Sequence, residues 1–202
     1  MPTQLTHINL LIVEPNPLLQ IELGNIVKQQ YPDAIVVPTK SIAEATKKLT
    51  EQSFDLAILE SDIENYDGFQ LINKIVTSQP NCKVLCYSNG NCKLAPSLSQ
   101  EFGAKGFISK HSTANEIMSA VNCLLAGFML FKPDDLQDMR KLSKREKLVF
   151  LYLSKGLTNK QISAKLFLSE KTISTYKVRL LKKFNSQSFV ALMNYKQAVL
   201  TA

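Results

Sequence analysis

Two different patterns of apolar and polar residues divide this chain. In the first 126 residues, short continuous apolar runs alternate with segments that have the periodicity of an amphipathic helix. Runs of this length predict strands that are buried on both faces. The expected strands lie at residues 8–13, 34–37, 56–59, 83–87 and 106–109, and the expected helices lie near residues 18–29, 42–52, 69–78, 94–102 and 115–126. The alternation predicts a doubly wound α/β domain with a five-stranded parallel sheet.

After residue 142 the pattern is helical throughout. Ser143, Thr158 and Ser169 each stand just before an amphipathic segment, where a hydroxyl group can cap the first backbone N–H groups of a helix. The expected helices run from residue 143 to about 155, from 159 to 166 and from 170 to 183, and a break at residues 185–188 precedes a last helix. The sequence therefore predicts an α/β domain at residues 1–126, a linker at 127–141, and an all-α four-helix domain with a helix-turn-helix at 142–202.

The segment at residues 170–183 has two unlike faces. Ile173, Tyr176, Leu180 and Phe184 recur every three or four residues and form an apolar stripe toward the domain core. The outer face mixes cations with short side chains, namely Lys171, Ser174, Thr175, Val178 and Lys182, with Lys177, Arg179 and Lys183 beside it. Lysine can neutralise DNA phosphates, whereas serine, threonine and valine can approach base edges in a major groove. This face is a candidate DNA-reading surface.

The positive charge of the chain is concentrated in the same region. Residues 1–137 hold 10 Lys and Arg against 14 Asp and Glu, whereas residues 138–202 hold 14 against 3. The formal net charge of +7 therefore comes entirely from the last third of the chain. A small domain this basic favours a polyanion as its partner, and counterion release would supply much of the affinity.

The stretch at residues 142–185, LSKREKLVFLYLSKGLTNKQISAKLFLSEKTISTYKVRLLKKFN, resembles the LuxR-type DNA-binding domain of NarL/FixJ response regulators. In that family the third helix of the four-helix module enters the major groove. The resemblance implies base-edge contacts from Ser174, Thr175 and Val178, and phosphate contacts from Lys160, Lys171, Thr172 and Lys177. Together with Arg179 and Lys182, these residues form the predicted DNA-binding site.

Polar side chains follow the expected strands at their carboxyl ends, where the functional groups of parallel sheets collect. They are Glu14, Glu60, Ser88 and Lys110. With the stretches DLAILESDIENYDG and GAKGFISK, this set resembles the receiver domain of response regulators. In that family, acids after the first strand hold a magnesium ion, an aspartate after the third strand accepts a phosphoryl group, and the hydroxyl and the lysine respond to it. Phe107 takes the place of an aromatic that swings inward, although phenylalanine is more often simply core. The surface around residues 94–102 and 115–126, with the strand between them, corresponds to a dimerisation or partner face, and ordinary amphipathic packing would give the same pattern.

Two residues depart from the receiver pattern. Pro15 stands where the family has a second acid, and proline offers no side-chain oxygen to Mg²⁺. Glu60 stands at the acceptor position, and its extra methylene moves the nucleophilic oxygen by about an ångström. Because positioning is most of the catalysis in phosphoryl transfer, we expect a degenerate pocket that holds no metal or cofactor and is not phosphorylated conventionally. Two roles of Glu60 stay open: a fixed charge that imitates the phosphorylated state with Lys110 and Ser88, or a relic ion pair.

Composition and cysteine usage set further limits. The 202 residues, 45% of them hydrophobic, suit two small domains. No apolar run approaches the length of a bilayer span and the start lacks the pattern of a signal peptide, so a cytoplasmic protein is expected. The cysteines lack a paired spacing and neighbouring histidines, which favours reduced packing thiols over a metal site. They are Cys82, Cys86, Cys92 and Cys123.

The expected function is a DNA-binding transcription regulator, and not an enzyme. Its expected partners are double-stranded DNA and a second copy of the chain, with a sensor kinase or another regulatory protein as a further candidate and no membrane. The last helix, with Phe189, Leu192, Met193 and Val199, could form a dimer contact or simply core. Three alternatives stay open: an orthodox response regulator controlled by phosphorylation, a protein-binding adaptor whose basic tail is incidental, and a small-molecule site in the degenerate pocket.

Overall fold

A computed structural model of the chain describes residues 7–63, 67–89, 94–131, 141–184, 186 and 188. The expected five-stranded parallel sheet is present, with the strand order β2-β1-β3-β4-β5. Its strands are β1 (Asn9–Val13), β2 (Ile35–Thr39), β3 (Leu56–Leu59), β4 (Lys83–Ser88) and β5 (Gly106–Ser109). Its helices are α1 (Pro17–Gln30), α2 (Ile42–Glu51), α3 (Gly68–Ser78), α4 (Leu94–Glu101) and α5 (Ala114–Leu125). The doubly wound architecture predicted from the sequence is confirmed.

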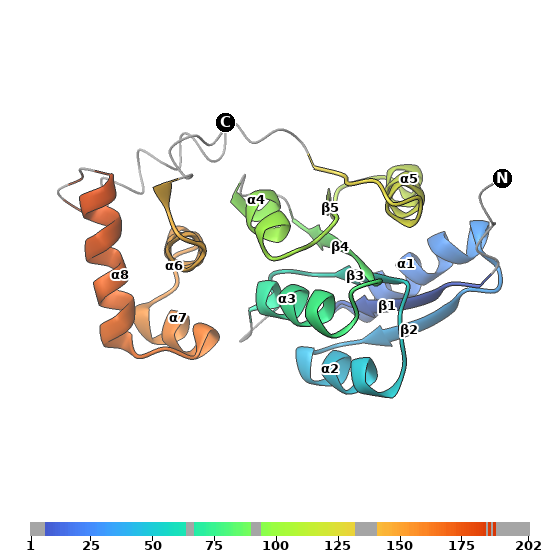
Figure 1. The fold of residues 1–202 in the computed structure, drawn as a ribbon, viewed down its shortest axis with the longest axis horizontal. Coiled ribbons are helices and arrows are strands. Elements are labelled where there is room, and N and C mark those ends of the chain that lie inside the picture. Colours follow the sequence, from blue (N-terminus) through green and yellow to red (C-terminus); the bar gives the residue numbers. More distant parts are fainter. Residues whose placement is uncertain are drawn as a thin grey trace.

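Helices cover both faces of the sheet (Figure 1), with α1 and α5 on one side and α2, α3 and α4 on the other. Along β1, Leu10 and Ile12 pack in the cluster with α1 and α5, whereas Leu11 and Val13 pack in the cluster with α2 and α3. Successive side chains of a strand point to opposite faces, so a strand covered on both sides must be apolar at every position. This is why the strands appear as continuous apolar runs.

The loop after β3 packs tightly against the start of α3. The Asp67 carboxylate accepts a hydrogen bond from the backbone N–H of Phe69 and so caps α3. A Cβ atom on Gly68 would lie 2.6 Å from the carbonyl oxygen of Ser61, so only glycine fits at this point. The close approach fixes where residues 61–63 lie relative to α3.

The second domain contains α6 (Lys144–Ser154), α7 (Asn159–Leu166) and α8 (Glu170–Lys183). Ser143, Thr158 and Ser169 cap these three helices, as the sequence predicted. The predicted last helix lies outside the described residues, and so do residues 132–140 of the predicted linker. In the described part of that linker, Leu130 pairs with Gly106 at the start of β5.

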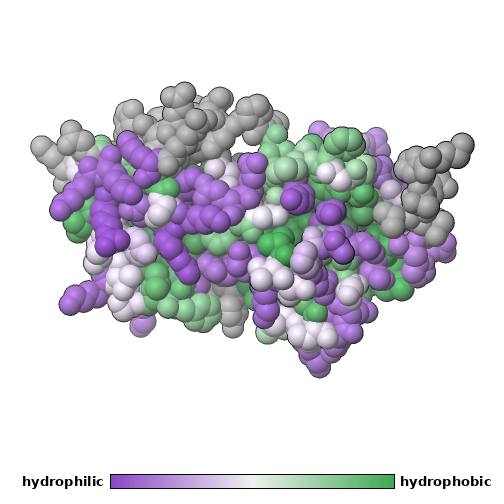
Figure 2. Space-filling model, viewed as in Figure 1, coloured by the Kyte–Doolittle hydropathy of each residue, from purple (hydrophilic) through white to green (hydrophobic). Residues whose placement is uncertain are grey.

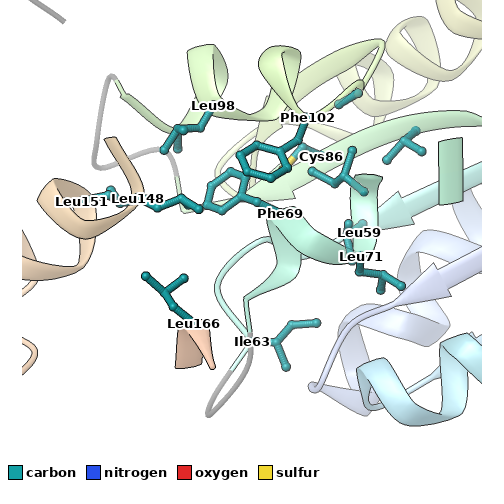
Figure 3. Packing of buried hydrophobic residues seen from close by; sticks show 14 of the residues in the cluster. Leu59, Ile63, Phe69, Leu71, Cys86, Leu98, Phe102, Leu148, Leu151 and Leu166 are labelled. Carbon is teal, nitrogen blue, oxygen red and sulfur yellow. The ribbon is translucent and has the colours of Figure 1, made fainter. Parts of the chain in front are cut away.

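The second domain packs directly on the first. Leu148 and Leu151 of α6 and Leu166 of α7 lie in one apolar cluster with Phe69, Leu98 and Phe102 of the first domain (Figure 3). Helix α8 lies on the side of α6 that faces away from the sheet (Figure 1). In the described ranges, no helix is both long enough and apolar enough to cross a membrane.

Candidate nucleic-acid interface and the pocket of the sheet

Helix α8 presents the two faces that its sequence predicted. Ile173 and Leu180 are fully buried, and Tyr176 and Phe184 are half-buried against the same core. Hydrophilic residues cover the end of the molecule that α8 forms (Figure 2). The exposed members of the predicted DNA-binding site are Lys160, Lys171, Ser174, Thr175, Val178, Arg179 and Lys182, and the half-buried members are Thr172 and Lys177. Seven of the nine predicted residues are therefore exposed to solvent.

Lys183 serves a different purpose from its neighbours. Its Nζ lies 2.7 Å from a carboxylate oxygen of Glu146 and 3.1 Å from the backbone oxygen of Lys141. Burial raises the pKa of Glu146, but hydrogen bonds from Lys183 and Ser143 outweigh it and leave that pKa below its ordinary value. The sequence pattern placed Lys183 beside the outer face, whereas the structure shows that it ties α8 to α6.

Asn159, the first residue of α7, is not among the residues predicted from the sequence. Its Nδ2 atom lies 3.1 Å from the hydroxyl oxygen of Ser174 on the outer face of α8. The same Ser174 hydroxyl lies 3.1 Å from the backbone oxygen of Glu170. No local pattern signals this contact, because an asparagine next to the Thr158 cap looks like part of the helix start.

At the carboxyl edge of the sheet, the structure brings the four predicted pocket residues together. Lys110 Nζ lies 2.6 Å from a carboxylate oxygen of Glu14 and 2.7 Å from one of Glu60. The Ser88 hydroxyl donates to the other oxygen of Glu60 at 2.7 Å. Burial lowers the pKa of the Lys110 ammonium, but the bonds to the two carboxylates outweigh it and raise the pKa above its ordinary value. Lys110 is therefore held as a cation between two acids.

The other residues that the sequence pointed to are not part of the network of Glu14, Glu60, Ser88 and Lys110. Pro15 is exposed, and Phe107 is half-buried against the larger core cluster. Cys82 and Cys86 are buried free thiols, and burial raises their pKa values to about 12 and about 11. Cys92 lies outside the described residues. Within the described ranges, no three His, Cys, Asp or Glu side chains are grouped as a metal site.

Polar contacts link the loop after β3 to the second domain, and sequence reasoning did not find them. The Asp62 carboxylate lies 2.6 Å from Lys155 Nζ and 3.8 Å from Lys165 Nζ. Lys165 Nζ also donates to the backbone oxygen of Ile63 at 2.7 Å. The same loop meets the pocket, because the Asp62 backbone N–H donates to Glu60 at 2.6 Å.

A buried tyrosine adds a further link between the domains. The Tyr152 hydroxyl of α6 donates to the Asp67 carboxylate at 2.9 Å, and both side chains are almost fully buried. Burial raises the pKa of Asp67 in spite of hydrogen bonds from Tyr152 and Phe69. Nearby, Lys144 and Lys147 of α6 bind Glu101 of α4. Part of the surface at residues 94–126, which resembled a dimerisation face, is thus occupied by α6.

Known proteins match both domains. Residues 10–122 match the family model of the response regulator receiver domain, and residues 140–195 match that of the bacterial regulatory proteins of the luxR family. A protein of Pseudomonas aeruginosa is 33% identical over 92% of this chain and 95% of its own length. The DNA-binding transcriptional activator EvgA of Escherichia coli is 27% identical over 94% of this chain and 97% of its own length.

Solved structures share the fold of the whole chain. The response regulator RcsB of Salmonella typhimurium aligns with a TM-score of 0.77 at 21% identity, over 96% of this chain and 98% of RcsB. Both predicted domains and their order along the chain are thus found together in known proteins. The chain belongs to the response regulators that join a receiver domain to a LuxR-family regulatory domain.

Proposed function

We propose that this response regulator binds duplex DNA in a sequence-specific manner through the outer face of α8, as a homodimer. The carrying observation is that α8 packs with Ile173 and Leu180 inward while Ser174, Thr175 and Val178 are exposed between cations. A helix of 14 residues is about 21 Å long and fits lengthwise into a major groove that is about 12 Å wide. EvgA is a DNA-binding activator, and RcsB has been solved with promoter DNA, which supports the same activity here.

The cations around α8 have the positions that phosphate contacts need. Lys160 stands at the start of α7, while Lys171 and Lys182 stand near the two ends of α8, all of them exposed. Each phosphate that a lysine neutralises contributes roughly 0.9 to the slope of log affinity against log salt concentration. If two copies bind together, the two half-sites should lie about one helical turn apart on the DNA.

The test is a fluorescence anisotropy titration of the full-length protein with labelled duplex DNA over a salt series. Lys171→Ala and Lys182→Ala should each weaken binding and lower the salt slope by about one. Lys28→Ala is the matched control, because Lys28 is an exposed lysine of α1 in the first domain. Absence of measurable DNA affinity at low salt would favour the protein-binding adaptor instead.

We further propose that the receiver domain is not phosphorylated in the conventional way. The carboxylate oxygens of Glu60 already bind the Ser88 hydroxyl, the Asp62 N–H and Lys110 Nζ, and the second carboxylate of the pocket, Glu14, also binds Lys110. The residues present do not fit the magnesium ion of the family, since Lys110 occupies both acids and Pro15 offers no oxygen. Attack by Glu60 on a phosphodonor would have to break these bonds.

Glu60 instead binds Ser88 and Lys110, the two residues that would contact a phosphoryl group in the family. Its negative charge keeps Lys110 and the Ser88 hydroxyl in charge-assisted hydrogen bonds of 2.7 Å each. We propose that this arrangement makes DNA binding independent of a phosphodonor. The competing role, a relic pair without regulatory effect, predicts that changing Glu60 leaves DNA binding as it is.

Two measurements separate these cases. Intact mass after incubation with acetyl phosphate and Mg²⁺ should show no stable phosphoryl group on the wild-type protein, and a gain of one would support orthodox control. The double variant Pro15→Asp with Glu60→Asp restores the family residues and is the positive control. Glu60→Gln should weaken binding to selected DNA if the charge is regulatory, and should leave it unchanged if the pair is a relic.

A further inference from the structure

We infer that Asn159, together with the Glu170 carbonyl, holds Ser174 as a hydrogen-bond acceptor toward one base and so contributes to DNA specificity. The inference rests on the proposed DNA binding by α8. The two residues come from different helices, and the contact joins the start of α7 to the outer face of α8.

The Ser174 hydroxyl carries a single proton. The hydroxyl oxygen lies 3.1 Å from the backbone oxygen of Glu170. A carbonyl oxygen can only accept, so the hydroxyl of Ser174 must donate its proton there. Ser174 then has no proton left to offer to DNA.

The side-chain amide of Asn159 faces the same hydroxyl oxygen. Its Nδ2 lies 3.1 Å from the Ser174 oxygen. Because the serine proton is already committed, only the donor end of the amide can face this oxygen, which fixes the orientation of the amide. The bond uses one of the two acceptor positions of the hydroxyl and leaves one free.

The exposed Ser174 oxygen can recognise only a hydrogen-bond donor on a base. Ser174 offers one acceptor and no donor toward solvent on the face of α8. In the major groove, adenine N6 and cytosine N4 are donors, whereas guanine N7 and O6 and thymine O4 are acceptors. A serine without such constraints can pair with either kind. With its proton held by the Glu170 carbonyl and one acceptor position occupied by Asn159, Ser174 directs its remaining acceptor toward adenine or cytosine at one position of each half-site.

The experiment selects DNA from a randomised duplex library with the full-length protein, as wild type, Ser174→Ala and Asn159→Ala. The wild type should enrich adenine or cytosine at one position per half-site, and Ser174→Ala should lose that enrichment alone. Asn159→Ala should weaken it by roughly two- to tenfold, the value of one hydrogen bond. Lys160→Ala is the control at the neighbouring residue, since losing a phosphate contact lowers affinity evenly across sequences. Melting curves confirm that each variant is folded.

The outcomes separate this inference from the function on which it rests. If the wild type selects DNA and the Asn159→Ala profile superimposes on that of the wild type, the inference is overturned while DNA binding stands. It is also overturned if the position lost in Ser174→Ala is guanine or thymine. If the folded wild type binds no DNA even at low salt, the proposed function fails, and the inference fails with it.

Discussion

The hydrogen bond between Tyr152 and Asp67 should be a principal polar link between the two domains. Tyr152→Phe removes the hydroxyl and keeps the ring in its apolar surroundings. Asp67 is 2% exposed, and in the described part of the structure its Oδ2 atom has no hydrogen-bond partner. A hydrogen bond to a buried charged group is worth about 1.5–3 kcal/mol, so the free energy of unfolding should fall by about 2 kcal/mol. For a chain of this size that corresponds to a Tm lower by roughly 4–8 °C.

The assay is urea unfolding followed by circular dichroism, at equal protein concentration. Tyr31→Phe is the matched control, because the Tyr31 hydroxyl donates to neutral Asn122 at 2.8 Å within the first domain. It should cost about 1 kcal/mol. A double-mutant cycle with Asp67→Asn isolates the energy of the Tyr152 pair. If the free energy of unfolding of Tyr152→Phe stays within about 0.5 kcal/mol of that of the wild type, the buried Asp67 carboxylate does not need the Tyr152 hydroxyl, and the reasoning is refuted.

The loss of stability in Tyr152→Phe should depend on pH. Burial raises the pKa of Asp67 above its ordinary value of 3.8, so the folded protein holds this proton more tightly than the unfolded chain. The contribution of Asp67 to stability is therefore full below its ordinary pKa and is lost as pH rises through the raised value. The ionised form needs the Tyr152 hydroxyl more than the neutral form does. The difference in the free energy of unfolding between the wild type and Tyr152→Phe should thus be larger at neutral pH than at acid pH.

Three further substitutions test other contacts. Lys110→Met leaves Glu14 and Glu60 as buried acids without their cation and should cost about 3–5 kcal/mol in urea unfolding, whereas a loss below 1 kcal/mol would contradict the buried network. Asp62→Ala should lower the free energy of unfolding by about 1–2 kcal/mol, because its pair with the exposed end of Lys155 is screened by solvent but the buried Lys165 also loses a nearby carboxylate. Gly68→Ala should lower stability by about 1–3 kcal/mol in thermal melts, since the new methyl group would lie 2.6 Å from the Ser61 oxygen; an unchanged melt would show that the loop yields freely.

Local patterns were sufficient to predict the elements of the fold. β3 lies at the expected residues 56–59, because a strand covered on both faces leaves no polar position inside the run. β5 lies at the expected residues 106–109. In the described part of the second domain, α7 begins after the Thr158 cap and spans the expected residues 159–166. Apolar runs and helix caps depend only on residues that are close together in the chain, so they can be identified from a single sequence.

Contacts between distant segments could not be read in the same way. Tyr152 lies in one apolar cluster with Leu148 and Leu151 of its own helix, and nothing in the helical periodicity shows that this face also meets the first domain. Lys165 is 6% exposed, although a lysine in an amphipathic helix normally reaches solvent. Burial in this case follows from the Ile63 carbonyl and the Asp62 carboxylate, about 100 residues earlier in the chain.

The loop after β3 joins the pocket to the second domain through consecutive residues. Glu60 accepts the backbone N–H of Asp62 with the same oxygen that binds Ser88, so the carboxylate fixes the course of the chain directly after the strand. Asp62 and Ile63 then bind Lys155 and Lys165. A side chain at position 60 that cannot accept from both Ser88 and Asp62 must release one of them, and the release of Asp62 moves the residues that hold the second domain. The geometry of the pocket and the placement of α6 and α7 therefore constrain each other, and this connection needs no phosphoryl group.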